Sequence, residues 1–225
     1  NDEKNVRHDV TWYFTSGSMG QGWSLDADFV YTYLNRDGSR FTDRADYKST
    51  TYAEQFENRD YRLMQSIRYP GYTRRNNNVN TPYAPDFGYC VTGYQPIKWV
   101  IDDTSMDSNT APCATCIPIL RYAEVLLNEA EAAARAGDKT LALEKLNQVR
   151  DRSLADPATQ TYKAGDFANT KALVEAILWE RRIEFQGEGR RWEDIHRLAA
   201  DDLLPSGGIP AKIEYNNVKN QGAFV

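Results

Sequence analysis

The stretch that most constrains the fold runs from Glu180 to Leu198 and reads ERRIEFQGEGRRWEDIHRL. It contains two helical pieces that meet at Gly187 and Gly189, and almost all of its polar residues are arginines or carboxylates. The planar guanidinium of arginine pairs with a carboxylate through two parallel hydrogen bonds. We therefore expect a partly buried network of ion pairs that clamps two helices at a glycine corner. An anion site or a catalytic acid pair is the alternative for the same side chains.

Four helices are predicted in the second half of the chain, because apolar residues recur there at helical spacing. Proline suits a first helical turn and glycine a helix end, so the first helix is expected over Ile119–Ala136, between Pro118 and Gly137. Its apolar face consists of Leu120, Ala123, Leu126, Leu127, Ala130 and Ala134.

The other three helices are delimited by residues whose side chains can cap a helix. The second helix carries an apolar face of Leu143, Leu146 and Val149. The expected boundaries are a cap at Asp138 or Thr140 for the second helix, a span from Asn169 or Thr170 to Gln186 for the third, and a span from near Arg191 to before Pro205 for the fourth.

The first two helices match the tetratricopeptide pattern across Ala123–Arg150, with Gly137 and Asp138 at the turn between them. Only one such repeat is legible. A single repeat cannot bury both of its apolar faces, so it must stack on other elements of the fold.

The first 116 residues show no long helical period and combine aromatic runs with glycine and serine, as short strands and loops do. A short helix is expected over Ala27–Leu34 with Asp26 as its cap, followed by a turn over Asn35–Gly38. Pro70–Pro96 reads as one long loop, which in a compact domain is usually functional or disordered, and its aromatic residues argue against disorder. Ile97–Ile101 is expected to form a strand.

Composition excludes several classes of protein. The chain has 225 residues with 27 basic and 32 acidic side chains, a net charge of −5, and no basic face or arm, so no nucleic-acid partner is expected. No apolar run approaches the roughly 18 residues of a membrane span. The motifs GxSxG and HExxH are absent, so we expect a protein that is not an enzyme. A glycosidase can hold its two carboxylates far apart in sequence, but no feature favours one.

Cys113 and Cys116 have the spacing of a redox motif or of half a zinc site. A zinc site needs two further ligands, and only Cys90, His8 and His196 remain. A disulfide or two incidental thiols are therefore favoured.

Asp102, Asp103 and Asp107 form a short acidic loop that could hold Ca²⁺ through oxygen ligands. They lack the spacing and the distal glutamate of a calcium-binding loop, so a solvated turn is expected. We expect neither a metal nor a cofactor in this chain.

The aromatic residues are the candidate ligand-binding residues. There are five Trp, 14 Tyr and eight Phe, concentrated in the first hundred residues. Sugar rings present C–H faces that stack on indole and phenol rings, while amide and guanidinium groups bond the hydroxyls. The alternative is that these rings fill the core of a region poor in aliphatic residues. The candidate glycan-binding residues are Trp12, Trp23, Tyr72, Arg74, Asn77, Tyr83 and Tyr89.

The helical motifs resemble those of the SusD/RagB family of nutrient-binding outer-membrane lipoproteins. Leu120–Ser153 and Leu173–Leu198 follow the order and spacing of the family through LRYAEVLLNEAEA, LNQVRDRS and LVEAILWERRIEFQGEGRRWEDIHRL. The segments NRDGSRF, FENRDYRLMQSIRYPG and GYQPIKWV agree more weakly and in the same order. The resemblance covers most of the chain.

The resemblance implies a mainly α, SusD-like fold in which a tetratricopeptide-like helical scaffold carries a large loop-rich part with a few short strands. The whole chain, residues 1–225, would be one SusD/RagB-like C-terminal domain. Residues 1–116 would be its loop-rich, ligand-facing part, residues 117–204 its helical scaffold, and residues 205–225 an irregular tail.

The resemblance also implies a function. Family members bind glycans or oligosaccharides at the bacterial cell surface without catalysis and deliver them to a partner SusC-like TonB-dependent transporter. Capture of peptides by a tetratricopeptide-like module, as in the RagB-like branch, is the alternative. The ligand aromatics of the family lie in variable loops without a motif, so the candidate residues named above rest on composition alone.

Finally, the resemblance implies a surface-exposed lipoprotein of the outer membrane of Bacteroidota, anchored by a lipidated N-terminal cysteine. The chain begins at Asn1 with no initiator Met and no signal segment, and it contains neither that anchor nor the N-terminal half of a family member. We therefore expect a processed product or fragment whose membrane contact would depend on the anchor that this chain lacks.

Overall fold

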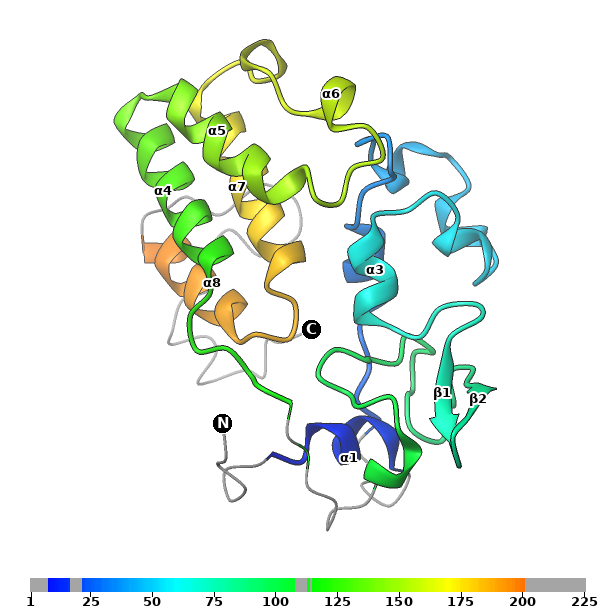
Figure 1. The fold of residues 1–225 in the computed structure, drawn as a ribbon. Helices are drawn as coiled ribbons and strands as arrows, with labels where there is room; N and C mark the ends of the chain where they lie inside the picture. The colour runs from blue at the N-terminus through cyan, green and yellow to red at the C-terminus, as the bar shows by residue number, and fades with distance from the viewer. Residues whose placement is uncertain (1–7, 17–21, 108–112, 114, 201–225) are drawn as a thin grey trace, which may run out of the picture.

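The computed structural model describes residues 8–16, 22–107, 113 and 115–200 and is mainly helical (Figure 1). Short 3₁₀ turns lie at Phe41–Asp43, Tyr47–Ser49, Glu54–Phe56, Thr104–Met106 and Ala164–Asp166. The helices and strands are α1 (Val10–Thr15), α2 (Ala27–Tyr31), α3 (Tyr61–Ser66), β1 (Thr73–Asn76), β2 (Val79–Pro82), α4 (Tyr122–Ala136), α5 (Lys139–Arg150), α6 (Pro157–Gln160), α7 (Thr170–Glu184) and α8 (Arg190–Ala200).

The long helices α4, α5, α7 and α8 gather on one side of the molecule, and α1, α3 and the β1–β2 hairpin lie on the other (Figure 1). Helix α4 packs against both α5 and α7. Their facing sides are apolar and exclude water, which is the dominant source of stability for such a bundle. The buried residues of this core include Leu126, Leu127, Ala130, Leu143, Leu146, Val149, Leu173, Ile177, Leu178 and Phe185.

The ends of these helices follow from their capping residues. Gly137 has a φ of +87°, and this left-handed conformation ends α4 at little steric cost. The Asp138 side chain accepts from the Leu141 N–H at the start of α5, and Asn169 accepts from the Ala172 N–H at the start of α7. In each case the structure selects the first of the two predicted caps.

The corner between α7 and α8 lies where the glycines predicted it. Gly187 and Gly189 have φ values of +74° and +79°, which side chains with a Cβ rarely adopt. Helix α8 begins at Arg190, one residue before its expected start. Its predicted end and the predicted irregular tail, residues 205–225, lie outside the described residues.

The predicted start of the first long helix is wrong. The helix begins at Tyr122, whereas Pro118 is not helical and Leu120, expected on the apolar face, is 64% exposed. Arg121 has extended backbone angles, and its side chain reaches Glu184 and Glu188 near the end of α7. Because Arg121 reaches these carboxylates from an extended backbone, the helix begins only after Arg121.

The loop-rich part has its own core, centred on α2 and α3. Val30, Tyr33, Leu63 and Ile67 are fully buried there, together with Ile183 from α7. The Trp179 indole N–H on α7 donates to the Thr32 carbonyl at 2.9 Å. Two residues of α7 therefore attach the loop-rich part to the helical part. The predicted helix after Asp26 is confirmed but shorter, and the predicted turn closes with a bond from the Gly38 N–H to the Asn35 carbonyl.

Two predictions in this part are wrong. The expected loop Pro70–Pro96 contains the antiparallel β1–β2 hairpin, whose register pairs Asn76 with Val79. Asn77 and Asn78 both have positive φ, at +49° and +64°, as a type I′ hairpin turn requires. Conversely, the expected strand Ile97–Ile101 is a turn, because Trp99 has a φ of +71° and the Val100 N–H donates to the Ile97 carbonyl.

Among the described residues, no helix has both the length and the apolar character needed to cross a membrane.

Candidate functional site

Three large apolar side chains of the loop-rich part lie exposed on neighbouring segments. Phe87 is 74% exposed, Val91 72% and Trp23 48%. We call these three side chains the apolar ledge. Exposed apolar groups in one place usually mark a surface that binds something.

Hydrogen bonds hold the two segments of the apolar ledge side by side. The Leu25 N–H donates to the Tyr94 carbonyl at 3.0 Å, and the Thr92 hydroxyl donates to the Leu25 carbonyl at 2.7 Å. A Cβ on Gly22 would lie only 2.7 Å from Cγ1 of Val91, so Val91 packs directly on the backbone beside Trp23. The ledge is therefore built from fixed backbone contacts.

The rings of the apolar ledge also have defined supports. The Trp23 indole meets the ring of Phe14 edge-on, with 6.4 Å between centroids and 71° between planes, which is a favourable aromatic geometry. The ring of Phe87 lies over Gly93, where a Cβ would come within 3.5 Å of Cζ. Each ring thus rests one face or edge on the protein and leaves much of its surface to solvent.

Gln95 joins helix α1 to the loop that carries Phe87. This side chain is fully buried; its amide N–H donates to the Phe14 carbonyl at 2.7 Å, and its amide oxygen accepts from the Asp86 N–H at 3.0 Å. This one buried amide therefore holds both Phe14, which supports Trp23, and the backbone next to Phe87.

The structure brings three of the sequence-predicted residues together in a second group. Tyr72 is 7% exposed and Arg74 1% exposed, and the Tyr83 N–H donates to the Tyr72 carbonyl at 2.9 Å. The Arg74 guanidinium donates to both oxygens of Asp107, at 2.7 and 2.6 Å, and lies 5.5 Å from the centroid of the Tyr83 ring. Tyr72 and Arg74 therefore attach the hairpin to the segment after residue 100 and present little surface to a ligand.

The acidic loop is a turn with exposed or half-exposed carboxylates, as expected from sequence, and these carboxylates also bond to the hairpin. Asp107 accepts from Arg74, Asp103 accepts from Arg75 at 2.8 Å, and Asp102 accepts from the Tyr72 hydroxyl at 3.2 Å. Burial, with the adjacent Asp102 carboxylate, raises the pKa of Tyr72 to about 12, so that hydroxyl stays a donor. These three carboxylates therefore bond to side chains of the hairpin and of Tyr72 just before it.

The remaining predicted residues lie apart from this second group. Asn77 is exposed at the tip of the hairpin. Trp12 is half-buried on α1 with its ring 5.4 Å from that of Tyr13. Tyr89 is half-buried on the same loop as Phe87.

Sequence reasoning missed two residues of the ledge, Phe87 and Val91. The available signal was their position: both are large apolar residues in a loop segment punctuated by Gly88 and Gly93. Glycines in such a segment allow another part of the chain to approach the backbone closely.

The arginine–carboxylate cluster is the structural clamp that the sequence predicts. Glu184 on α7 accepts from Arg121 and Arg152 at 2.6 Å each and from Arg62 on α3 at 2.7 Å. Burial alone would raise the pKa of Glu184, but the charges and hydrogen bonds of these guanidiniums outweigh it and lower the pKa to about 2. One carboxylate therefore connects the loop-rich part, the segment before α4, and α7.

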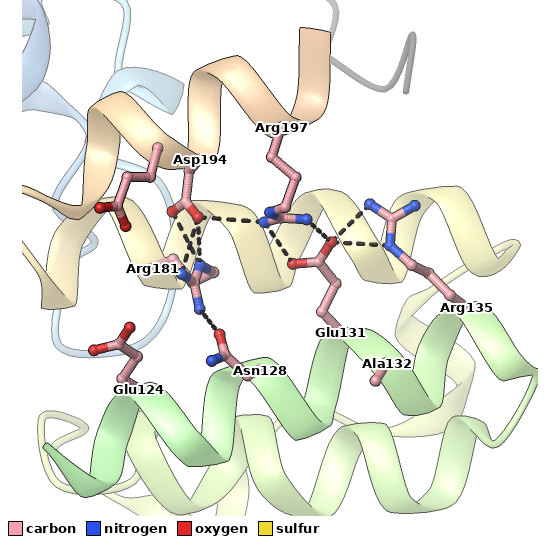
Figure 2. A pocket seen from close by; sticks show the side chains of 9 residues that line it. Glu124, Asn128, Glu131, Ala132, Arg135, Arg181, Asp194 and Arg197 are labelled. Atoms are coloured by element: carbon pink, nitrogen blue, oxygen red, sulfur yellow. Dashed lines mark hydrogen bonds and ion pairs between the residues drawn. The ribbon is translucent and has the colours of Figure 1, made fainter. Parts of the chain in front are cut away.

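A hollow of about 610 Å³ opens between α4 and α8 (Figure 2). Arg181 on α7 points into it, and its guanidinium donates to Asp194 at 2.9 Å and to Asn128 at 2.6 Å. Arg197 donates to Glu131 at 2.6 Å. The lining is thus a set of helix-to-helix ion pairs that matches the clamp in character, and its charges are engaged with one another.

The cysteines carry free thiols, so of the two alternatives left by the sequence, incidental thiols apply. Cys113 is 2% exposed and lies 3.3 Å from the Thr11 hydroxyl and 3.2 Å from that of Thr115. Burial would raise the pKa of Cys113, but these hydrogen bonds outweigh it and lower the pKa. Within the described ranges, no group of three or more His, Cys, Asp or Glu side chains could hold a metal ion.

Comparison with known proteins identifies the class of this fold. The chain is 33% identical over 156 residues to a SusD-like protein of Formosa agariphila, an alignment that covers 67% of this chain and 26% of the relative. A crystal structure of a SusD-like protein from Bacteroides fragilis superposes with a TM-score of 0.61 at 23% identity, covering 80% of this chain and 36% of that one. This chain therefore spans about a quarter of the first protein and about a third of the second.

The sequence model of the SusD family matches residues 2–223. That match takes in the helical part, the hairpin and the apolar ledge alike. The predicted mainly α, SusD-like fold is confirmed. This chain belongs to the SusD family.

Proposed function

We propose that this chain binds glycans without converting them, as the ligand-facing portion of a protein that passes oligosaccharides to a transporter. Membership of the SusD family supports this class of function. The observation that carries the location of the site is the apolar ledge, with Trp23, Phe87 and Val91 exposed on hydrogen-bonded segments.

The chemistry of the apolar ledge suits a pyranose ring. An indole and a phenyl ring present flat apolar faces that gain free energy when a sugar's C–H face displaces water from them. Their positions are fixed before binding, which reduces the conformational entropy that binding must overcome. A preformed platform of this kind favours capture over catalysis.

The proposed site takes Trp23 and Tyr89 from the sequence-based candidates and adds Phe87 and Val91. Trp12, Asn77 and Tyr83 keep some exposed surface and remain candidates for the outer part of the site. We assign Tyr72 and Arg74 to support of the hairpin, because both are buried and bonded to Asp102 and Asp107.

Family membership also supports the cellular setting. We place the whole protein at the outer surface of the outer membrane as a lipoprotein, with a SusC-like TonB-dependent transporter as its partner. The helical part would then be the scaffold that presents the ledge, since its own charges pair within the bundle.

The test is isothermal titration of the purified chain with a panel of soluble oligosaccharides, with product analysis of each mixture. We expect saturable binding of at least one glycan and no product. Replacing Trp23 with Ala should weaken that binding about tenfold, or about 1.4 kcal/mol, because the largest ring of the ledge is removed.

Trp192→Ala is the matched control, since Trp192 on α8 is 51% exposed, close to the 48% of Trp23. Its affinity should equal that of the wild type. Equal weakening by both substitutions, or a preference for peptides over every sugar, would move the site away from the ledge and favour peptide capture.

A further inference from the structure

We infer that the apolar ledge selects uncharged glycans and rejects sulfated sugars and uronates. This inference rests on the proposed function and names the class of ligand for the same site. Its basis is the distribution of charge over the segments that build the ledge.

The described segments that form and support the ledge contain no lysine or arginine. Residues 8–16, 22–35 and 76–97 include Asp9, Asp26, Asp28 and Asp86, and all 27 lysines and arginines of the chain lie elsewhere. Proteins that bind sulfate or carboxylate groups ordinarily use guanidinium or ammonium groups, often with bidentate arginine. The ledge therefore combines exposed apolar rings with carboxylates as its local charges.

Several arginines from other segments do reach these stretches. Arg59 and Arg74 are each 1% exposed; Arg59 donates to the carbonyls of Val30 and Tyr33, and Arg74 is paired with Asp107. Arg182 lies 5.3 Å from the centroid of the Phe29 ring and interacts electrostatically with Asp26 and Asp28. Arg68 is 3% exposed and donates to the Ala84 carbonyl at 2.8 Å. Arg59, Arg68 and Arg74 are thus buried, and the half-buried Arg182 lies near two carboxylates.

The carboxylate closest in sequence to the ledge is Asp86, next to Phe87. It is exposed and accepts from the Gly88 N–H at 2.7 Å. An exposed carboxylate can accept a hydrogen bond from a sugar hydroxyl, but it repels a sulfate within the screening distance of about 8 Å at physiological salt. The same groups thus favour neutral sugars and oppose anionic ones.

The test compares glycans that share a backbone and differ in charge. Isothermal titration is run with dextran and dextran sulfate oligosaccharides, and with neutral and glucuronic-acid-substituted xylan oligosaccharides. In any pair of glycans that binds, we expect the neutral glycan to bind about tenfold more tightly than the anionic one at low salt. This ratio of affinities is the gap that the test measures. This gap should narrow as salt screens the carboxylates.

A charge-gain variant makes the test specific to the ledge. Val91→Lys, at a 72% exposed position, should raise affinity for the anionic glycan and narrow the gap. The matched Val125→Lys on α4, at a 45% exposed position, should leave the gap unchanged. Narrowing by Val91→Lys alone supports the inference, and equal behaviour of both variants overturns it.

The outcomes separate the inference from the proposed function. Equal or tighter binding of the anionic glycan, still lost in Trp23→Ala, overturns the selectivity and leaves glycan binding at the ledge in place. If no member of any pair saturates the folded chain, both the selectivity and the proposed glycan binding are overturned.

Discussion

The helical part and the loop-rich part place buried arginines against different partners. Between the helices, Arg181 meets the Asp194 carboxylate, with both side chains 5% exposed. Under the loops, Arg59 is 1% exposed and donates to the carbonyls of Val30, Tyr33 and Gln55. Helices satisfy their own backbone groups, whereas irregular segments need side chains to do so.

The difference also explains where surface is left for a ligand. The helical part buries most of its apolar face in its own core, although Leu120, Tyr122 and Trp192 stay exposed, and its polar hollow is lined by mutual ion pairs. In the loop-rich part, buried polar side chains hydrogen-bond the backbone, and Trp23, Phe87 and Val91 remain exposed to solvent. Under the proposed function, the helical part would be the scaffold and the loop-rich part would present the ligand-binding surface.

The largest expected effect comes from the carboxylate that joins the two parts. Glu184→Gln removes the charge that three guanidiniums share in a mostly buried site, and it leaves Arg62 paired with Asp60 and Glu180 and Arg121 paired with Glu188 alone. We expect a loss of about 4 kcal/mol in the free energy of unfolding, measured by urea denaturation. Glu129→Gln is the control: Glu129 is 44% exposed and 3.8 Å from Lys145, so its loss should stay under about 0.5 kcal/mol.

The low pKa of the Glu184 carboxyl leads us to expect that the chain loses stability in acid. The pKa of Glu184 is about 2 in the folded chain against 4.5 ordinarily, so the folded state favours its ionised form. The resulting stabilisation, about 3 kcal/mol, is complete above pH 4.5 and is lost as the pH falls toward 2. The difference in unfolding free energy between wild type and Glu184→Gln should therefore shrink over that range. A difference independent of pH would contradict this assignment.

Arg59→Met should act on the loop-rich part with little effect on the helices. It leaves the carbonyls of Tyr33 and Gln55 without the donor they have in the folded chain, at a cost of about 2 kcal/mol. Amide hydrogen exchange should speed up around α2 and α3 and stay slow in α4 and α5. Arg44→Met, at an exposed ion pair with Asp46, is the control. Uniformly faster exchange in all four helices would show that the two parts unfold as one unit.

The smallest expected loss of stability comes from a substitution at Gly93, which lies under the ring of Phe87. Gly93 has a φ of +83° and carries that ring, so Gly93→Ala strains the backbone and displaces the ring. We expect a loss of about 1 kcal/mol in stability with a weaker glycan affinity. Gly165→Ala is the matched control, because a Cβ there meets no atom within 4 Å. Unchanged affinity in Gly93→Ala would remove Phe87 from the site.

The helical part could be predicted closely because its signals are local. Apolar spacing, the caps Asp138 and Asn169, and the glycine corner each act within a few residues. The exception, the start of α4, depends on Arg121 reaching Glu184, which lies 63 residues away in sequence. No local pattern reports such a contact.

The loop-rich part was less predictable for the same reason. Ile97–Ile101 has the composition of a strand, but Lys98 donates to the Gln186 carbonyl at 2.8 Å and the Trp99 indole to the Gly187 carbonyl at 3.3 Å. These long-range bonds favour a turn over strand propensity. The hairpin did have a local signal in Asn77 and Asn78, both tolerant of positive φ. Composition named Trp23 together with Tyr72 and Arg74 as candidates. Only the structure shows that Trp23 is exposed whereas Tyr72 and Arg74 are buried.

Hydrogen–deuterium exchange of the chain, with and without a saturating oligosaccharide, tests most directly whether the ligand lies on the apolar ledge. We predict slower exchange at residues 22–25 and 86–94 on binding, with α4 and α8 unchanged. Protection of α4 and α8 with none at the ledge would contradict the account and place the ligand between the helices.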